Sequence, residues 1–390
     1  MIRGLFLDTC AKRVAVAALS LSVGMIGMHE QAHAASGPGD SQLVYVGTQQ
    51  AKIEALRFYP STGRLITIGP VAKGLNATWV ESDPRRPVIY AVDDDKVREG
   101  SVTAYAVDRM TGALAELNRV DANGRGTTNL SLDLRSKTLL AASYNSGSVS
   151  TIALEPDGRL GARASTVQET GSGPNPHRQA SAHAHNAVVD PSGHYVLVPD
   201  LGADRVFVYG FDGATHALLP DRGEPPRALA TPPGSGPRHL VFGADGRFAY
   251  VITELSGEIF VLRWEPAQGG LAPVQTVSLS APQFTGVKSG AEINISADGR
   301  FVYAEDRGEN MLVVYRVDPQ SGELSELQRI ACGGEKPWGM ELDPSGRWLF
   351  VANQHSGNVA VFSVDPASGK LAATGATAQV PTAVSVAFVN

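Results

Sequence analysis

Two stretches near the C-terminus, Asp318-Pro-Gln-Ser-Gly-Glu-Leu324 and Asp365-Pro-Ala-Ser-Gly-Lys-Leu371, are copies of one motif. Weaker copies precede them, and the leucine that ends each copy falls at Leu65, Leu114, Leu160, Leu218, Leu271, Leu324 and Leu371. The leucines are about fifty residues apart, which is the repeat length of a propeller blade. The motif therefore predicts seven blades.

A second type of turn alternates with this motif, at Asp190-Pro-Ser-Gly193, Gly243-Ala-Asp-Gly246, Ser296-Ala-Asp-Gly299 and Asp343-Pro-Ser-Gly346. Between the turns lie short apolar or alternating runs such as Leu312-Val-Val-Tyr315, which are typical of strands. Each repeat therefore predicts four antiparallel strands. The expected fold is all-β: a seven-bladed β-propeller.

The two ends of the repeat array are complementary. No innermost strand precedes Leu43, whereas Pro381-Thr-Ala-Val-Ser-Val-Ala-Phe388 matches the innermost strand Pro237-Arg-His-Leu-Val-Phe242. We therefore expect the C-terminal strand to complete the first blade and close the ring. The alternative, an open solenoid, would leave sheet edges exposed.

Residues 1–34 have the pattern of a signal peptide. Basic residues precede an apolar run over residues 14–27, which is too short to cross a bilayer, and Ala32-His33-Ala34 offers a cleavage site. A buried N-terminal helix is the alternative. We expect residues 35–390 to form a single seven-bladed propeller domain, periplasmic or secreted, with no membrane insertion after cleavage.

Composition narrows the possible functions. With 43% hydrophobic residues the chain is not a disordered protein, and its net charge of −6 excludes a general nucleic-acid binder. Removal of residues 1–34 takes away Cys10 and leaves Cys332 alone, so neither a disulfide nor a thiolate metal site is expected. Cys332 is interpreted as a small core residue. We expect a monomer without a cofactor.

The repeat register places the charged residues. Counting from the second turn gives the starts of the innermost strands as Thr78, Thr128, His185, Arg238, Ala291 and Trp338. The ends of the second strands are Asp93-Asp94, Ser143-Tyr144, Asp200-Leu201, Thr253-Glu254, Asp306-Arg307 and Asn353-Gln354. In an antiparallel pair these positions share one edge. The register therefore predicts that His185, Arg238, Glu254 and Arg307 surround one mouth of the central channel.

This set of side chains suits the opening or closing of a lactone. Guanidinium groups bind carboxylate or phosphate and stabilise a developing oxyanion, and an imidazole transfers protons near neutral pH. Glu254 could orient the imidazole, position water or act as the base. The alternative is structural: Arg238 and Arg307 would brace loops through Asp306 or Glu254, and His185 would be a core histidine.

A Gly-, Pro- and Ser-rich insertion over residues 171–185 precedes the fourth blade. Such an insertion on the ligand side of a propeller is expected to contact substrate. The predicted substrate-binding residues are Gln179, His183, Asp200 and His239. His183 and His185 could suggest a metal site, but no cluster of further ligands accompanies them, and none is expected.

The motifs His183-Ala-His185, Asp200-Leu-Gly-Ala-Asp-Arg-Val206, Gly236-Pro-Arg-His-Leu240, Thr253-Glu-Leu255 and Asp306-Arg-Gly308 resemble the lactonase family of seven-bladed propellers. This family includes bacterial propeller-type 6-phosphogluconolactonase and fungal carboxy-cis,cis-muconate lactonizing enzyme. The resemblance extends from about Leu43 to Val389. It implies a catalytic His, two Arg and a Glu, which here are His185, Arg238, Arg307 and Glu254.

The sequence departs from the family pattern at three positions. Thr253 and Asp306 stand where Asn is common, and Asp306 is expected to neutralise Arg307 partly. Trp338 replaces a common Arg. The expected function is 6-phosphogluconolactonase-like hydrolysis of a sugar or related lactone, with export favouring an unphosphorylated substrate. The alternatives are a muconate-type lactonizing cycloisomerase acting on a dicarboxylate, and a non-catalytic exported binding propeller, which a mouth plugged by side chains would favour.

Overall fold

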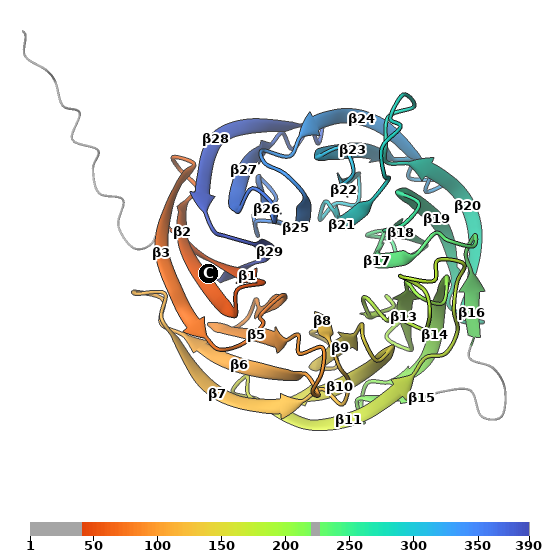
Figure 1. The fold of residues 1–390 in the computed structure, drawn as a ribbon, viewed down its shortest axis with the longest axis horizontal. Coiled ribbons are helices and arrows are strands. Elements are labelled where there is room, and N and C mark those ends of the chain that lie inside the picture. The colour runs from red at the N-terminus through yellow and green to blue at the C-terminus, as the bar shows by residue number, and fades with distance from the viewer. Residues whose placement is uncertain (1–40, 220–226, 390) are drawn as a thin grey trace, which may run out of the picture. The chain divides into compact units, whose positions relative to one another are not determined.

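The computed structural model describes residues 41–219 and 227–389, so the predicted signal peptide lies outside the described residues. The regular elements within these two ranges are all strands, and they contain no helix that could span a membrane. The strands form seven antiparallel sheets arranged as blades around a ring (Figure 1). The predicted seven-bladed β-propeller is confirmed.

The blades follow one another along the chain. Blade one holds β1 (Gln42–Thr48), β2 (Lys52–Tyr59), β3 (Arg64–Lys73) and β29 (Ala383–Val389). Blade two holds β4 (Val80–Asp83), β5 (Val88–Asp93), β6 (Ser101–Val107) and β7 (Leu114–Asp121). Blade three holds β8 (Thr127–Asp133), β9 (Thr138–Ser143), β10 (Ser148–Leu154) and β11 (Leu160–Gln168).

Blade four differs from the predicted pattern. Its described strands are β12 (Val188–Val189), β13 (Tyr195–Asp200), β14 (Arg205–Asp212), β15 (Ala217–Leu219) and β16 (Arg227–Ala230). Both β15 and β16 pair with β14, so two short segments occupy the place of one outer strand. Blade four therefore keeps the predicted four strand positions, with β15 and β16 sharing the outermost one.

The last three blades are regular. Blade five holds β17 (Pro237–Phe242), β18 (Phe248–Thr253), β19 (Glu258–Glu265) and β20 (Gly270–Ser278). Blade six holds β21 (Gly290–Ile295), β22 (Phe301–Asp306), β23 (Met311–Val317) and β24 (Leu324–Ala331). Blade seven holds β25 (Pro337–Leu342), β26 (Trp348–Asn353), β27 (Asn358–Val364) and β28 (Leu371–Gln379).

The ring closes through the C-terminal strand. β29 pairs antiparallel with β1, with Leu43 opposite Val389 and Val44 opposite Phe388, and its residues are buried throughout (Figure 1). β29 is therefore the innermost strand of blade one, as predicted. Because the N- and C-terminal strands share one sheet, both ends of the chain complete blade one, and the solenoid alternative is wrong.

The Asp-Pro-Ser-Gly turns are held by their own aspartates. The carboxylate of Asp190 accepts the backbone N–H groups of Ser192, His194 and Tyr195, and Gly193 supplies the positive φ of 80° that the turn requires. Asp343 makes the corresponding bonds in blade seven. These turns fix the registers of the innermost strands and therefore the positions of residues at the opposite strand ends.

The position of Cys332 confirms that it is a core residue. It is fully buried in an apolar cluster between blades six and seven, and burial raises its thiol pKa to about 12. A thiol that stays protonated is a poor nucleophile.

The innermost strands begin less regularly than predicted. β4 starts at Val80 rather than Thr78, and β12 starts at Val188 rather than His185. In the other four blades with a predicted start the register shifts there, between Thr127 and Asn129, between Pro237 and His239, between Gly290 and Ile293, and between Pro337 and Gly339. A bulge re-aims the side chain of its extra residue, so Thr128, Arg238 and Trp338 turn toward the channel mouth.

Candidate active site

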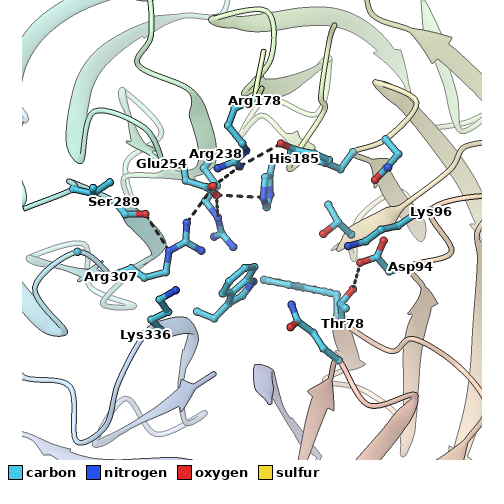
Figure 2. A pocket seen from close by; sticks show the side chains of 18 of the residues that line it. Thr78, Asp94, Lys96, Arg178, His185, Arg238, Glu254, Ser289, Arg307 and Lys336 are labelled. Carbon is cyan, nitrogen blue, oxygen red and sulfur yellow. Dashed lines mark hydrogen bonds and ion pairs between the residues drawn. The ribbon is translucent and has the colours of Figure 1, made fainter. Parts of the chain in front are cut away.

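A cavity of about 850 Å³ opens at the mouth that the register predicts (Figure 2). Five predicted strand starts line it: Thr78, Thr128, His185, Arg238 and Trp338. The second members of four predicted pairs also line it: Asp94, Tyr144, Glu254 and Arg307. The four residues singled out from the sequence as catalytic thus lie together, contributed by blades four, five and six.

Glu254 is the centre of the charge arrangement. Its Oε1 accepts from Arg178 Nη2 at 2.5 Å and lies 3.2 Å from Arg307 Nη2, while its Oε2 lies 3.2 Å from Arg238 Nε. Burial alone would raise the pKa of Glu254, but Arg307 and Arg238 lower it well below its usual range. Glu254 is therefore held as a carboxylate that pairs with three guanidinium groups and aligns them, while its single negative charge offsets only one of their positive charges.

Arg307 is held firmly but keeps one free donor. Its Nε donates to Ser289 Oγ at 3.1 Å, and its guanidinium lies 4.5 Å from the ring centroid of Trp338. Its Nη1 is buried and has no hydrogen-bond partner among the described residues. Trp338, which replaces a common arginine of the family, therefore provides a platform for Arg307 rather than another positive charge.

His185 faces the cavity through one of its two nitrogens. Its Nδ1 lies 3.1 Å from Nε2 of His239, whereas its Nε2 is 3.9 Å from Glu254 Oε2, beyond hydrogen-bond distance. Burial, with the nearby charge of Arg238, lowers the pKa of His185 well below its ordinary value. The imidazole is therefore neutral near pH 7 and has one nitrogen available as a proton acceptor.

The residues predicted to bind substrate lie outside this cavity in the described part of the chain. The buried amide of Gln179 donates to the carbonyl of Leu201 and to Asp204. Asp200 accepts the backbone N–H groups of His183 and Ala203. These hydrogen bonds fold the insertion of residues 171–185 onto blade four, which explains why polar residues gather there.

The two histidines of the insertion diverge. The ring of His183 stacks on Tyr144 at a centroid distance of 4.3 Å, and its Nδ1 lies 2.7 Å from the carbonyl oxygen of Tyr144. His185 instead approaches His239, which is buried behind it. Neither His183 nor His239 is thus placed to touch a ligand in the cavity.

The sequence count missed three cationic residues of the cavity. Arg178 lies on the insertion and reaches Glu254 across blade boundaries, and Lys96 and Lys336 lie on loops at the rim (Figure 2). Loop residues have no register, so counting along strands could not place them. A cation within the Gly- and Pro-rich insertion was the one signal that pointed to Arg178.

The expected pairing of Asp306 with Arg307 is wrong. Asp306 is fully buried and lies 3.6 Å from Arg329 Nη1, while Arg307 points to Glu254. Successive residues at a strand end face opposite sides, which separates the two neighbours. Asp306 therefore does not neutralise Arg307.

Comparison with known proteins now identifies the family. Residues 43–388 match the family model "Lactonase, 7-bladed beta-propeller". The chain belongs to the lactonase family. It is 34% identical over 275 residues to 6-phosphogluconolactonase of Bacillus subtilis, covering 70% of this chain and 76% of that protein. It is 29% identical over 298 residues to 6-phosphogluconolactonase of Formosa agariphila, covering 75% and 82%.

A solved lactonase structure also superimposes closely. The periplasmic gluconolactonase of Pseudomonas aeruginosa has a TM-score of 0.81 and 33% identity, covering 90% of this chain and 99% of that one. The predicted family and the predicted activity class, lactone hydrolysis, are confirmed. The chain is an enzyme of the lactonase type, so the alternative of a non-catalytic binding propeller is wrong.

Proposed function

We propose that the protein hydrolyses a sugar lactone bound in this cavity. His185 would accept the proton, and Arg307 would be the main hydrogen-bond donor to the oxyanion. One observation carries this proposal. His185 and Arg307 both line this cavity, and neither Nε2 of His185 nor the buried Nη1 of Arg307 has a hydrogen-bond partner among the described residues. A lone pair and an unsatisfied N–H, both fixed by neighbours, are what attack of water on an ester carbonyl requires.

The proposed steps balance without a cofactor. His185 Nε2 takes a proton from water as the water oxygen bonds to the carbonyl carbon, and the carbonyl oxygen becomes negative beside Arg307. The bond between this carbon and the ring oxygen then breaks, and the alkoxide that leaves recovers the proton. Arg238 and Arg178 act through Glu254, which keeps the guanidinium groups in place as the charge moves.

Hydrolysis fits this cavity better than the cycloisomerase alternative. Gripping a dicarboxylate would need two free guanidinium groups, but Arg238 and Arg307 are both paired with Glu254. Arg238 also donates to the carbonyl of Ala291 at 2.6 Å. One carboxylate thus already occupies the position that a second substrate carboxylate would take.

The substrate we propose is an unphosphorylated aldonolactone of the gluconolactone type, met outside the cytoplasm. The leader-like sequence of residues 1–34 and the similarity to a periplasmic gluconolactonase support this location. Thr78, Thr128 and Asp94 line the same cavity as His185 and can bind sugar hydroxyls. Arg238 and Arg307 each use part of their donor set on Glu254, so neither offers a phosphate a complete two-pronged fork.

The test is a pH-stat assay of the purified protein with gluconolactone and 6-phosphogluconolactone at matched concentrations. After subtraction of spontaneous hydrolysis, we expect faster turnover of the unphosphorylated lactone. His185→Asn should lower kcat/KM by about 10²–10⁴ while leaving the thermal transition unchanged. Preference for the phosphorylated lactone would overturn the substrate, and a folded variant with parental activity would overturn the role of His185.

A further inference from the structure

Behind the cavity, His185 begins a chain of three buried groups. His185 Nδ1 lies 3.1 Å from His239 Nε2, and His239 Nδ1 lies 2.7 Å from Glu292 Oε1. The exposed fractions of the three residues are 7%, 3% and 5%. They come from blades four, five and six, so the contacts run across the ring rather than along one strand.

The hydrogen bonds fix the proton positions. An ionised Glu292 can only accept, so His239 must carry its proton on Nδ1 and accept from His185 at Nε2. His185 then carries its proton on Nδ1 and presents a bare Nε2 to the cavity. Arg238 Nη1 also lies 3.4 Å from His239 Nδ1, but its short hydrogen bond at 2.6 Å goes to Ala291.

A positive imidazolium is unfavourable at either ring. Burial, with the nearby charge of Arg238, lowers the pKa of both His185 and His239 well below the ordinary histidine value. Alone, His185 would therefore be a weak base. A base that passes the proton onward avoids this charge.

Glu292 is suited to receive such a proton. Its Oε1 accepts from the backbone N–H of Ile293, but its Oε2 is buried and has no partner among the described residues. Glu292 and His239 both line a second cavity of about 400 Å³, which His185 does not line. The acceptor is therefore separated from the substrate by the two imidazoles.

The charged groups that face Glu292 come from several blades. Arg238 is the nearest cation, and Glu305 Oε2 accepts the backbone N–H of Glu292. Glu81 and Glu341 line the same second cavity and oppose its ionisation. Burial outweighs Arg238 and raises the pKa of Glu292 to about 7.

We propose that His185, His239 and Glu292 form a proton relay in which Glu292 is the final acceptor of the proton taken from the attacking water. His185 Nε2 gains the water proton, its Nδ1 proton passes to His239 Nε2, and the Nδ1 proton of His239 passes to Glu292. Each ring gains one proton and loses one, so neither becomes an imidazolium. The reverse sequence protonates the leaving alkoxide and restores the starting tautomers.

The relay rests on the proposed function only for the role of His185 in lactone opening. His239 and Glu292 act through His185 and are positioning residues. They make His185 a base when Glu292 is ionised and leave an N–H on Nε2 when Glu292 is protonated. The tautomer of His185 should therefore change as Glu292 titrates.

The direct test is nitrogen NMR of the full protein labelled with ¹⁵N-histidine, with His185 assigned by the signals lost in His185→Asn. At pH 8.5 we expect neutral His185 protonated on Nδ1, with conversion to the Nε2–H form as the pH falls to 5.5. Glu292→Gln should abolish the conversion. Glu305→Gln, a neighbouring buried carboxylate that does not touch His239, is the matched control and should retain it.

A kinetic test separates the relay from a merely structural role. The acid limb of kcat/KM should disappear in Glu292→Gln and persist in Glu305→Gln. His239→Gln should lower kcat by at least about tenfold with KM little changed. If Glu292→Gln does not fold, His239→Gln takes its place in the NMR test and should likewise abolish the tautomer conversion.

The outcomes distinguish the two proposals. His185 protonated on Nε2 at pH 8.5, or a tautomer change that survives Glu292→Gln, would overturn the relay whatever the enzyme hydrolyses. The expected tautomers without any turnover of sugar lactones would support the relay and overturn the proposed substrate class.

Discussion

Glu254 and Glu292 are both buried glutamates that interact with Arg238, yet they differ in charge. Glu254 belongs to what we term the mouth cluster, with Arg178, Arg238 and Arg307, and its pKa is lowered. Glu292 belongs to the channel carboxylates, with Glu81, Glu305 and Glu341, and its pKa is raised to about 7. The number of facing cations, rather than burial, decides which carboxylate is ionised.

The largest expected effect is on the stability of variants in which one of the two glutamates is replaced by Gln. Glu254→Gln leaves Arg238 and Arg307 buried without an anionic partner and should lower the free energy of unfolding by roughly 3 kcal/mol or more. Glu292→Gln replaces a group that is protonated below about pH 7 and should cost much less at pH 6. Denaturant titration of both variants at pH 6 measures this. Equal losses of unfolding free energy would show that Glu254 and Glu292 do not differ in charge as stated.

The next effect concerns the free N–H of the mouth cluster. Arg307→Met should lower kcat/KM by roughly 10²–10³, as loss of one oxyanion donor does, and Arg307→Lys should recover only part of it. Arg300→Met is the matched control, because Arg300 lies 5.0 Å from the ring of Phe301 in the same blade but is exposed. Similar activities of the two Met variants would exclude Arg307 as the donor.

The fold could be predicted because the same turn motif occurs once in every blade. Asp318 and Asp365 open the same turn as weaker copies elsewhere, so an error in one copy does not alter the count. The positions of Glu254 and Arg307 followed from the same register, since strand ends in successive blades are equivalent. Blade four was the exception, because its insertion and divided outer strand have no equivalent in the other blades.

The approach of His239 and Glu292 to the channel beside Arg238 could not be predicted from strand periodicity. Arg238 and His239 are successive, and a regular strand would send them to opposite faces. The bulge between Pro237 and His239 lets both approach the channel, and a second bulge between Gly290 and Ile293 does the same for Glu292. Gln179 and Asp200 lie outside the cavity lining because their hydrogen bonds tie the insertion to blade four.

A smaller effect follows from the raised pKa values of the channel carboxylates. Folded Glu292 and Glu305 titrate at about 7 and about 8, so the unfolded chain loses these protons first and stability falls as pH rises. His185 and His239 act oppositely, but only below their ordinary pKa of about 6.5.

Between pH 6.5 and 8.5 we therefore expect a loss on the order of 2 kcal/mol. Thermal melts across this range check it, and Glu305→Gln should flatten the curve. Stability that rises over the same interval would show that the channel carboxylates are ionised in the folded protein, which would remove the contrast with the mouth cluster.

The smallest effect concerns the rim of the mouth, where Lys96 and Lys336 are exposed. An exposed charge contributes up to about 1 kcal/mol and is screened by salt, so Lys336→Met should change KM for gluconolactone by less than about threefold. The same variant should raise the KM for 6-phosphogluconolactone by a larger factor, because a phosphate near the rim would interact with the ammonium group. KM values for both lactones at low and high salt measure this difference. An equal change for both substrates would mean that Lys336 does not discriminate by charge, and selectivity against phosphate would then have to arise deeper in the cavity, where Glu254 occupies donors of Arg238 and Arg307.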